Sequence, residues 1–362
     1  MKNQNQEMFL PQERIEDYIR LRNNPSKSMD ELLEYPTYFT IEPTADCNAA
    51  CRMCALAHNL NRFMKDDLFE SIMGEIGENS AKINQIQIQG RGEPLLDERI
   101  ANKVDLISNT YKIKTSMASN VSLLTPFLSE DILDANLGAL IMSIDSLDKD
   151  VYEKIRRGLI FEEVIENTHN FLDMRNKKGS NTQVRLRMIE QNPNSSEWEE
   201  YKDYWQPKLR KTDRLTVKKV HNWGTKLKIK DVKELKTDQI HFPCHGLWGT
   251  FNIMYNGDVI LCPGDSANQM SLLGNVTTES IKEIYCGKKL DKIRQQHMKG
   301  NKVPNAWCAT CKQWAEPSDF ENIGEKLFPE LYEAHPEYRN TTDLCMREQP
   351  ANVNTETLEN YG

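Results

Sequence analysis

The sequence has no hydrophobic run that approaches the length of a membrane span, and it has no excess of positive charge. Its 362 residues carry a net charge of -8 with a pI near 5.6. This balance argues against nonspecific nucleic-acid binding, because such binding depends on a basic field. The start, MKNQNQEMFLPQERIEDYIR, has neither the apolar segment nor the cleavage site of a secretory signal. We therefore expect a cytoplasmic protein with no nucleic-acid or membrane partner.

Cysteine is absent between Cys54 and Cys244, although the chain contains nine cysteines. A disulfide scaffold would distribute its cysteines differently, and clustered cysteines in a reducing compartment more often serve metals or catalysis. Metal chemistry on both sides of the gap is therefore expected. The nine are Cys47, Cys51, Cys54, Cys244, Cys262, Cys286, Cys308, Cys311 and Cys345.

Short segments rich in β-branched residues alternate with longer amphipathic segments through much of the chain. The expected strands are 38–43, 83–90, 112–117, 139–145, 184–190 and 215–220, and the expected helices are 67–79, 97–110, 128–136, 161–175 and 195–205. Such repeats imply parallel strands with right-handed crossovers, hence an α/β barrel or a doubly wound sheet. Both folds gather their sites on loops after the carboxyl ends of strands.

The pattern changes in the C-terminal third. Residues 251–262 predict a β-hairpin with an Asn256-Gly257 turn, and residues 279–300 predict helix. We expect an N-terminal helical extension at 1–37, a barrel at 38–225, a small α+β domain at 240–315 and a partly flexible C-terminal extension at 316–362.

The segment CNAACRMC places Cys47, Cys51 and Cys54 directly after the first expected strand. Thiolates select zinc, copper(I) or iron–sulfur clusters. A structural zinc site usually has four protein ligands, whereas a cubane held by three cysteines leaves one iron open. A zinc knuckle that uses His58, or a Cys51/Cys54 redox pair, is the alternative.

This CxxxCxxC spacing resembles the signature of the radical S-adenosylmethionine (SAM) superfamily. The resemblance implies a partial (β/α)6 barrel and a [4Fe-4S] cluster whose open iron is chelated by the amino and carboxylate groups of SAM. Reductive cleavage of SAM then gives a 5′-deoxyadenosyl radical. Met53 stands where the family usually has an aromatic residue, and its backbone is expected to meet the adenine.

Two further motifs carry the resemblance toward the SAM amino and carboxylate groups. GRGEPLL is similar to the family's Gly-Gly-Glu-Pro turn, with Arg91 where glycine is common, so Gly92 and Glu93 are expected at the SAM amino group. DVYEKIRRG resembles a family Arg-Gly motif, which makes Arg157 the candidate for the SAM carboxylate. Arg156 is the alternative, and a solvated helix face would explain either arginine.

The ends of the third and fourth expected strands supply weaker matches. MASN resembles a Thr-Asn-Gly turn of the family, and this assigns Ser119 and Asn120 to the cofactor site. SIDS is similar to the family's Ser-x-Asp, so Ser143 and Asp145 are expected to meet ribose or substrate.

Four later cysteines, with the framing CPGD, LLGNV and NAWCATC, resemble the auxiliary-cluster domains called SPASM and, in a shortened form, twitch. A full SPASM domain continues with further cysteines soon after the CxxC pair, and here none follows before Cys345. We therefore expect the twitch form, with one auxiliary [4Fe-4S] cluster in electron transfer; a zinc ribbon is the alternative. The ligands would be Cys244, Cys262, Cys308 and Cys311.

Cys286 and Cys345 remain outside both sets. Each is a candidate hydrogen donor to a substrate radical, with an inert packing role as the alternative. Polar residues on the late strands and the following loop are candidates for the substrate, or else belong to an exposed face; they are Arg185, Arg187, Glu190, His221 and Asn222.

Three outcomes follow hydrogen abstraction: a two-electron oxidation with the auxiliary cluster as acceptor, epimerisation through a cysteine, or formation of a new bond. About 37 residues precede the first expected strand, too few for the leader-peptide-binding domain of many peptide-modifying relatives. We therefore expect a small polar substrate such as a sugar or aminocyclitol, with a peptide or protein as the alternative. The electron donor is expected to be a reductant such as flavodoxin or ferredoxin. A non-catalytic iron–sulfur or zinc protein is disfavoured by the strand-end motifs.

Overall fold

The computed structural model describes most of the barrel and part of the C-terminal third. The described residues are 12–54, 61–220, 243–267 and 271–299, with Cys308, Leu327, Pro329 and Glu333 and the backbone of Met346–Pro350. Within these ranges no helix is long and apolar enough to cross a membrane.

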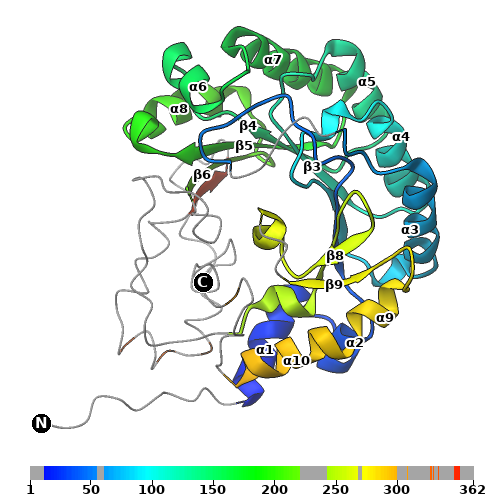
Figure 1. Cartoon of the computed structure of the whole chain (residues 1–362). Helices are drawn as coiled ribbons and strands as arrows, with labels where there is room; N and C mark the ends of the chain where they lie inside the picture. The colour runs from blue at the N-terminus through cyan, green and yellow to red at the C-terminus, as the bar shows by residue number, and fades with distance from the viewer. Residues whose placement is uncertain are drawn as a thin grey trace, which may run out of the picture.

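Six parallel strands follow one another in chain order and form the curved sheet of a partial barrel, as Figure 1 shows. Every neighbouring pair is parallel, which confirms the predicted α/β class. The strands are β1 (Tyr38–Ile41), β2 (Gln85–Ile88), β3 (Thr115–Ser119), β4 (Ala139–Ser143), β5 (Gln183–Glu190) and β6 (Arg214–Lys219).

Helices cover the outer face of this sheet (Figure 1). They are α3 (Asp66–Glu78), α4 (Ile100–Asp105) with a π-helical turn at Leu106–Thr110, α5 (Pro126–Asp134), α6 (Lys149–Ile155), α7 (Phe161–Lys178) and α8 (Trp198–Trp205). The short helix α6 is absent from the sequence-based expectation. Its first turn is capped by Asp148, whose side chain accepts a hydrogen bond from the Val151 amide.

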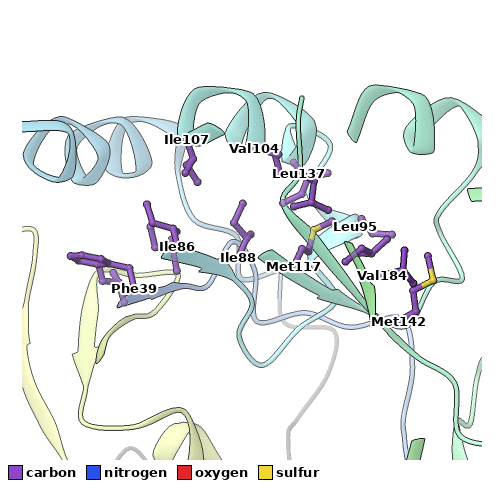
Figure 2. Packing of buried hydrophobic residues seen from close by; sticks show 14 of the residues in the cluster. Phe39, Ile86, Ile88, Leu95, Val104, Ile107, Met117, Leu137, Met142 and Val184 are labelled. Atoms are coloured by element: carbon purple, nitrogen blue, oxygen red, sulfur yellow. The ribbon is translucent and has the colours of Figure 1, made fainter. Parts of the chain in front are cut away.

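Alternation along the strands separates an apolar outer face from a polar inner face. On β2, Ile86 and Ile88 are buried, and Figure 2 shows them packed with Val104 and Ile107 beneath the helices. Burying each such side chain stabilises the fold by about 1.5–3 kcal/mol. Gln87, between the two isoleucines, points to the opposite face of the sheet. The core therefore lies between sheet and helices, and the concave side is left for polar chemistry.

The C-terminal third extends this sheet. Strand β7 (Thr250–Ile253) pairs in parallel with β1, and β8 (Asp258–Ile260) and β9 (Leu272–Asn275) follow antiparallel. The predicted hairpin turn is present, with Gly257 at φ +85°. The region expected as a separate small domain thus shares a ten-stranded sheet with the barrel.

The described residues contain four further α-helices and one further strand. Helices α9 (Ile281–Tyr285) and α10 (Lys288–Met298) replace the single expected helix, with a break at Cys286 and Gly287. The N-terminal α1 (Gln12–Asn23) and α2 (Met29–Glu34) lie beside α9 and α10 in Figure 1. Strand β10 (Met346–Pro350), within the extension predicted as partly flexible, pairs antiparallel with β6.

Candidate active site

The loop with the three cysteines leaves β1 at the edge formed by the carboxyl ends of the parallel strands, called the site edge below. Cys51 is buried, and Cys47 and Cys54 are half-buried. The pKa of the Cys47 thiol is raised to about 12, chiefly by burial. The hydrogen bond from the Ala49 amide opposes this shift, and nearby Glu93, Cys51 and Cys54 add to it. The three thiols therefore lie near one another, and the surroundings of Cys47 favour its neutral thiol.

The arrangement of the three thiols is compatible with a multi-iron cluster. Among the described residues, no three His, Cys, Asp or Glu side chains converge as one metal ion requires. A cluster spans several atoms, so its ligands stand farther apart. Three thiols gathered on one loop therefore agree with a cubane. The zinc knuckle stays an alternative, because His58 lies outside the described residues.

The turn after β2 packs directly on the cysteine loop. The amide of Glu93 donates to the Asp46 carbonyl oxygen at 2.8 Å. A Cβ at Gly92 would lie 2.1 Å from that same oxygen, so only glycine fits there. The GEP motif and the cysteine motif thus form one unit.

Glu93 joins this unit to the end of β3. Its carboxylate accepts the Ser119 hydroxyl and the Asn120 amide, each at 2.7 Å, and the Leu95 amide at 3.2 Å. Burial raises the pKa of Glu93 to about 7 although these hydrogen bonds oppose the shift. Gly92, Glu93, Ser119 and Asn120 are thus brought together as the sequence predicts. A carboxylate has about four acceptor sites, so about one remains for a ligand.

Asn48 is a site-edge residue that sequence reasoning missed. Its side-chain oxygen accepts from Asn120 Nδ2 at 2.9 Å, and its own Nδ2 donates to Ser122 Oγ at 2.8 Å. Ser122 Oγ in turn donates to Asn120 Oδ1 at 2.7 Å, which closes a ring of hydrogen bonds. The only signal in the sequence is its position next to Cys47.

Arg156, the alternative to Arg157 in the sequence, is the arginine that faces the cysteine loop. Its Nε donates to Asp145 Oδ2 at 2.6 Å, and Nη1 lies 3.7 Å from Cys51 Sγ. Burial alone would lower the pKa of Arg156, but Asp145 and Cys51 outweigh it and raise the pKa, so the guanidinium stays charged. Asp145 also accepts the Ile189 amide at 2.7 Å. The Asp145 carboxylate therefore stabilises the end of β5 as well as the position of Arg156.

Arg157 holds the same loop from outside. Its Nε donates to the Ala50 carbonyl oxygen at 3.0 Å, and the Ala50 amide donates to the Arg157 carbonyl at 2.7 Å. Its assignment to the SAM carboxylate stays a prediction. Met53 is buried in the core cluster next to Cys54, and Ser143 ends β4 half-exposed on the inner face.

The inner face of β5 is basic. Val184, Leu186 and Met188 are fully buried on the outer side, so Arg185 and Arg187 point to the concave side. Arg187 is in register with Ser143 of β4. Glu190 pairs with Lys219 of β6, and His221 and Asn222 lie outside the described residues.

The second cysteine set is only partly described. Cys244 precedes the short helix His245–Trp248, and Cys262 follows β8, where its Sγ accepts the Gly264 amide at 3.3 Å. Both are half-buried, as is Cys308, whereas Cys311 lies outside the described residues. The four-cysteine ligand set therefore stays a prediction.

Cys286 lies at the opposite edge of the sheet from the three cysteines. Its thiol is exposed at the end of α9 and lies 3.4 Å from the carbonyl oxygen of Leu33, in the helix that precedes β1. This placement separates it from the cysteine loop and gives no support to a hydrogen-donor role. Cys345 lies outside the described residues.

Comparisons with solved structures show similarity in fold. SuiB from Streptococcus suis bound to precursor peptide SuiA gives a TM-score of 0.59 at 18% identity, covering 77% of this chain and 70% of that one. BtrN in complex with AdoMet and 2-DOIA gives 0.53 at 16%, covering 76% and 92%. The structure of anSMEcpe with bound AdoMet and Cp18Cys peptide gives 0.53 at 17%, covering 84% and 98%.

Curated relatives match little more than a third of the chain. GTP 3′,8-cyclase from Alkaliphilus oremlandii is 29% identical over 135 residues, which is 36% of this chain and 41% of that protein. The enzyme of the same name from Alkaliphilus metalliredigens is 31% identical over 140 residues, or 37% and 43%. The chain thus spans less than half the length of these relatives.

Family matches cover both cysteine sets. Residues 41–188 match the Radical SAM superfamily, and residues 244–312 match SPASM, an iron-sulfur cluster-binding domain. The cofactors are accordingly SAM, a [4Fe-4S] cluster and an auxiliary iron–sulfur cluster. The chain belongs to the radical SAM superfamily and carries a C-terminal SPASM domain.

Proposed function

We propose that this protein is an oxidoreductase that removes two hydrogens from a small polar substrate of the sugar or aminocyclitol type. When bound and reduced by an external donor, the cofactors supply a 5′-deoxyadenosyl radical for one hydrogen atom and an acceptor for one electron, while a proton leaves to water. The supporting observation is the pairing of β1 with β7. The strand that leads to Cys47 thereby neighbours the hairpin that leads to Cys262.

The chain's own residues have definable tasks in this proposal. Cys47, Cys51 and Cys54 hold the cluster, and the Arg156 guanidinium beside Cys51 offsets the negative charge of bound thiolates. Glu93 has a remaining acceptor site for the SAM ammonium, in a buried position where an ion pair is strengthened by the low dielectric. Gly92 lets the backbone approach closely.

The inner face of the sheet supports a small polar substrate. Thr40, Gln87, Ser116, Ser143 and Arg187 present hydroxyl, amide and guanidinium groups from neighbouring strands. These groups suit a hydroxyl-rich molecule with few apolar contacts. A peptide is the alternative, since the structures of SuiB and anSMEcpe that resemble this fold contain peptides.

The auxiliary cluster's role can be tested with Cys262→Ala in anaerobically purified protein. We expect about eight irons per intact chain and about four in the variant, which should still cleave SAM but not oxidise substrate. Product mass in D2O separates the outcomes, because oxidation lowers the mass by about two units whereas thiol-dependent epimerisation adds deuterium. Stoichiometric zinc without iron, or undiminished oxidation by the variant, would contradict the proposal.

A further inference from the structure

Glu42, one residue beyond β1, is a buried carboxylate that binds two distant segments. It is 1% exposed. Its Oε1 accepts from the Arg91 amide at 2.7 Å and Arg91 Nε at 2.9 Å, and its Oε2 accepts from Arg91 Nη2 at 2.8 Å and the Tyr255 amide at 3.1 Å. The four hydrogen bonds match the acceptor capacity of a carboxylate.

The two segments belong to the two halves of the molecule. Arg91 lies inside the GRGEP turn, whose next residue, Gly92, contacts the cysteine loop. Tyr255 lies in the turn of the β7–β8 hairpin, and Cys262 lies two residues beyond the other end of β8. The Arg91 guanidinium carbon is also 5.6 Å from the centroid of the Tyr255 ring, within cation–π range.

Sheet pairing alone does not fix these turns. The last register pair of β1 and β7 is Ile41 with Ile253, followed by one bond from the Glu42 amide to the Ile253 carbonyl. Beyond this point the segments that follow β1 and β7 diverge into loops, and the Glu42 side chain connects these loops. Glycine at position 90 leaves room for the Glu42 side chain, because a Cβ there would lie 2.2 Å from Glu42 Cγ.

We propose that Glu42, with Arg91 and Tyr255, is a positioning unit that couples the SAM-side turn to the hairpin of the auxiliary cluster. Arg91 stands where the resembling motif commonly has glycine, so the coupling is a feature of this chain. The consequence for electron acceptance rests on the proposed function, because electron transfer falls steeply with cofactor separation. The coupling itself is a property of the fold and is tested separately.

Amide hydrogen exchange in the anaerobically reconstituted protein tests this unit directly, because backbone amides donate two of the four hydrogen bonds that Glu42 accepts. Glu42→Gln should speed exchange at the Arg91 and Tyr255 amides about tenfold. Arg91→Met, which leaves the Tyr255 amide's own partner in place, should also speed exchange at Tyr255. Arg91→Lys, without the planar fork, should give an intermediate change.

Asp213→Asn is the matched control. Asp213 is a fully buried carboxylate at the opposite edge of the sheet, and it accepts from Arg175 at 2.7 Å and from the Val184 and Arg210 amides, each at 2.8 Å. Its loss should speed exchange at Val184 and Arg210 and leave Arg91 and Tyr255 unchanged.

The functional consequence is measured as the ratio of oxidised product to 5′-deoxyadenosine. Glu42→Gln and Arg91→Met should lower this ratio about tenfold and keep 5′-deoxyadenosine formation within about twofold of wild type. Tyr255→Leu, which keeps the amide and removes the ring contact, provides a milder variant if the others fold poorly. The coupling is overturned if the exchange rate of the Tyr255 amide is unchanged in Arg91→Met, or if it rises equally in Asp213→Asn. If exchange is coupled but the wild type gives no oxidised product, the proposed function alone is contradicted.

Discussion

Two arginines are buried against carboxylates at opposite edges of the sheet. Arg175 donates to Asp213 at 2.7 Å, with both side chains fully buried, and Asp213 is otherwise occupied by backbone amides. Arg156 donates to Asp145 at 2.6 Å and also lies 3.7 Å from Cys51 Sγ. The first pair lies away from the three cysteines, whereas the arginine of the second pair also contacts a thiol. The same chemistry thus serves stability at one edge and a cofactor site at the other.

Arg156→Met should have the largest effect, because it changes both stability and SAM cleavage. It leaves Asp145 buried without its partner and removes the positive charge beside Cys51. We expect a loss of about 3–5 kcal/mol in the free energy of unfolding and a fall of at least about 100-fold in SAM cleavage. Denaturant titration and 5′-deoxyadenosine formation measure the two effects. Loss of stability with normal SAM cleavage would assign Arg156 to the fold alone.

Asp213→Asn removes the buried ion pair at the edge opposite the cysteine loop and should affect stability alone. The unpaired Arg175 should cost about 3–5 kcal/mol of stability, yet SAM cleavage by the folded fraction should stay within about twofold of wild type. The same two assays apply, at a temperature well below the unfolding transition. A selective loss of SAM cleavage would show that the two edges are not separable.

The raised pKa of Glu93 predicts that the stability of the protein depends on pH. Its pKa of about 7 in the folded protein lies above the ordinary value of 4.5. Its contribution to the free energy of unfolding is therefore fully present below about pH 4.5 and is lost as pH rises through about 7. Relative to Glu93→Gln, the wild type should lose about 3 kcal/mol of stability across this window. Denaturant titrations without SAM at several pH values measure the difference. A constant difference between the two proteins would contradict the raised pKa.

Asn48→Ala should have the smallest effect. It removes two hydrogen bonds of the ring with Asn120 and Ser122, at a cost of about 1–2 kcal/mol. Because the ring supports the cysteine loop, the affinity for SAM should fall several-fold while iron content is kept. Equilibrium binding of SAM to the reconstituted variant tests this. Unchanged affinity would limit the ring to a structural role.

Local patterns predict much of this molecule. Strand positions follow from alternating apolar residues, as in QIQI of β2, and the grouping of Glu93 with Ser119 and Asn120 follows from strand ends that meet at one edge. These features depend on residues close together in sequence or on a general rule for parallel sheets. A single sequence contains that information.

Other features depend on orientation or on distant contacts. Arg156 and Arg157 are adjacent in the sequence, and only the structure shows that Arg156 lies beside Cys51 whereas Arg157 donates to the Ala50 carbonyl oxygen. The bond between Glu42 and Tyr255 joins residues 213 positions apart. The pairing of β7 with β1 likewise has no local signal, because both strands are short and similar in pattern. Such contacts are set by packing of the whole chain.

We propose that the three-cysteine loop holds a cluster open to SAM. The most direct measurement is 5′-deoxyadenosine formation by the anaerobically reconstituted protein after addition of dithionite and SAM, beside the Cys51→Ala variant. We expect 5′-deoxyadenosine from the wild type and a fall of at least about 1,000-fold in the variant, which lacks one of the three proposed cluster ligands. No 5′-deoxyadenosine from a wild type with an intact, reduced cluster would contradict this proposal.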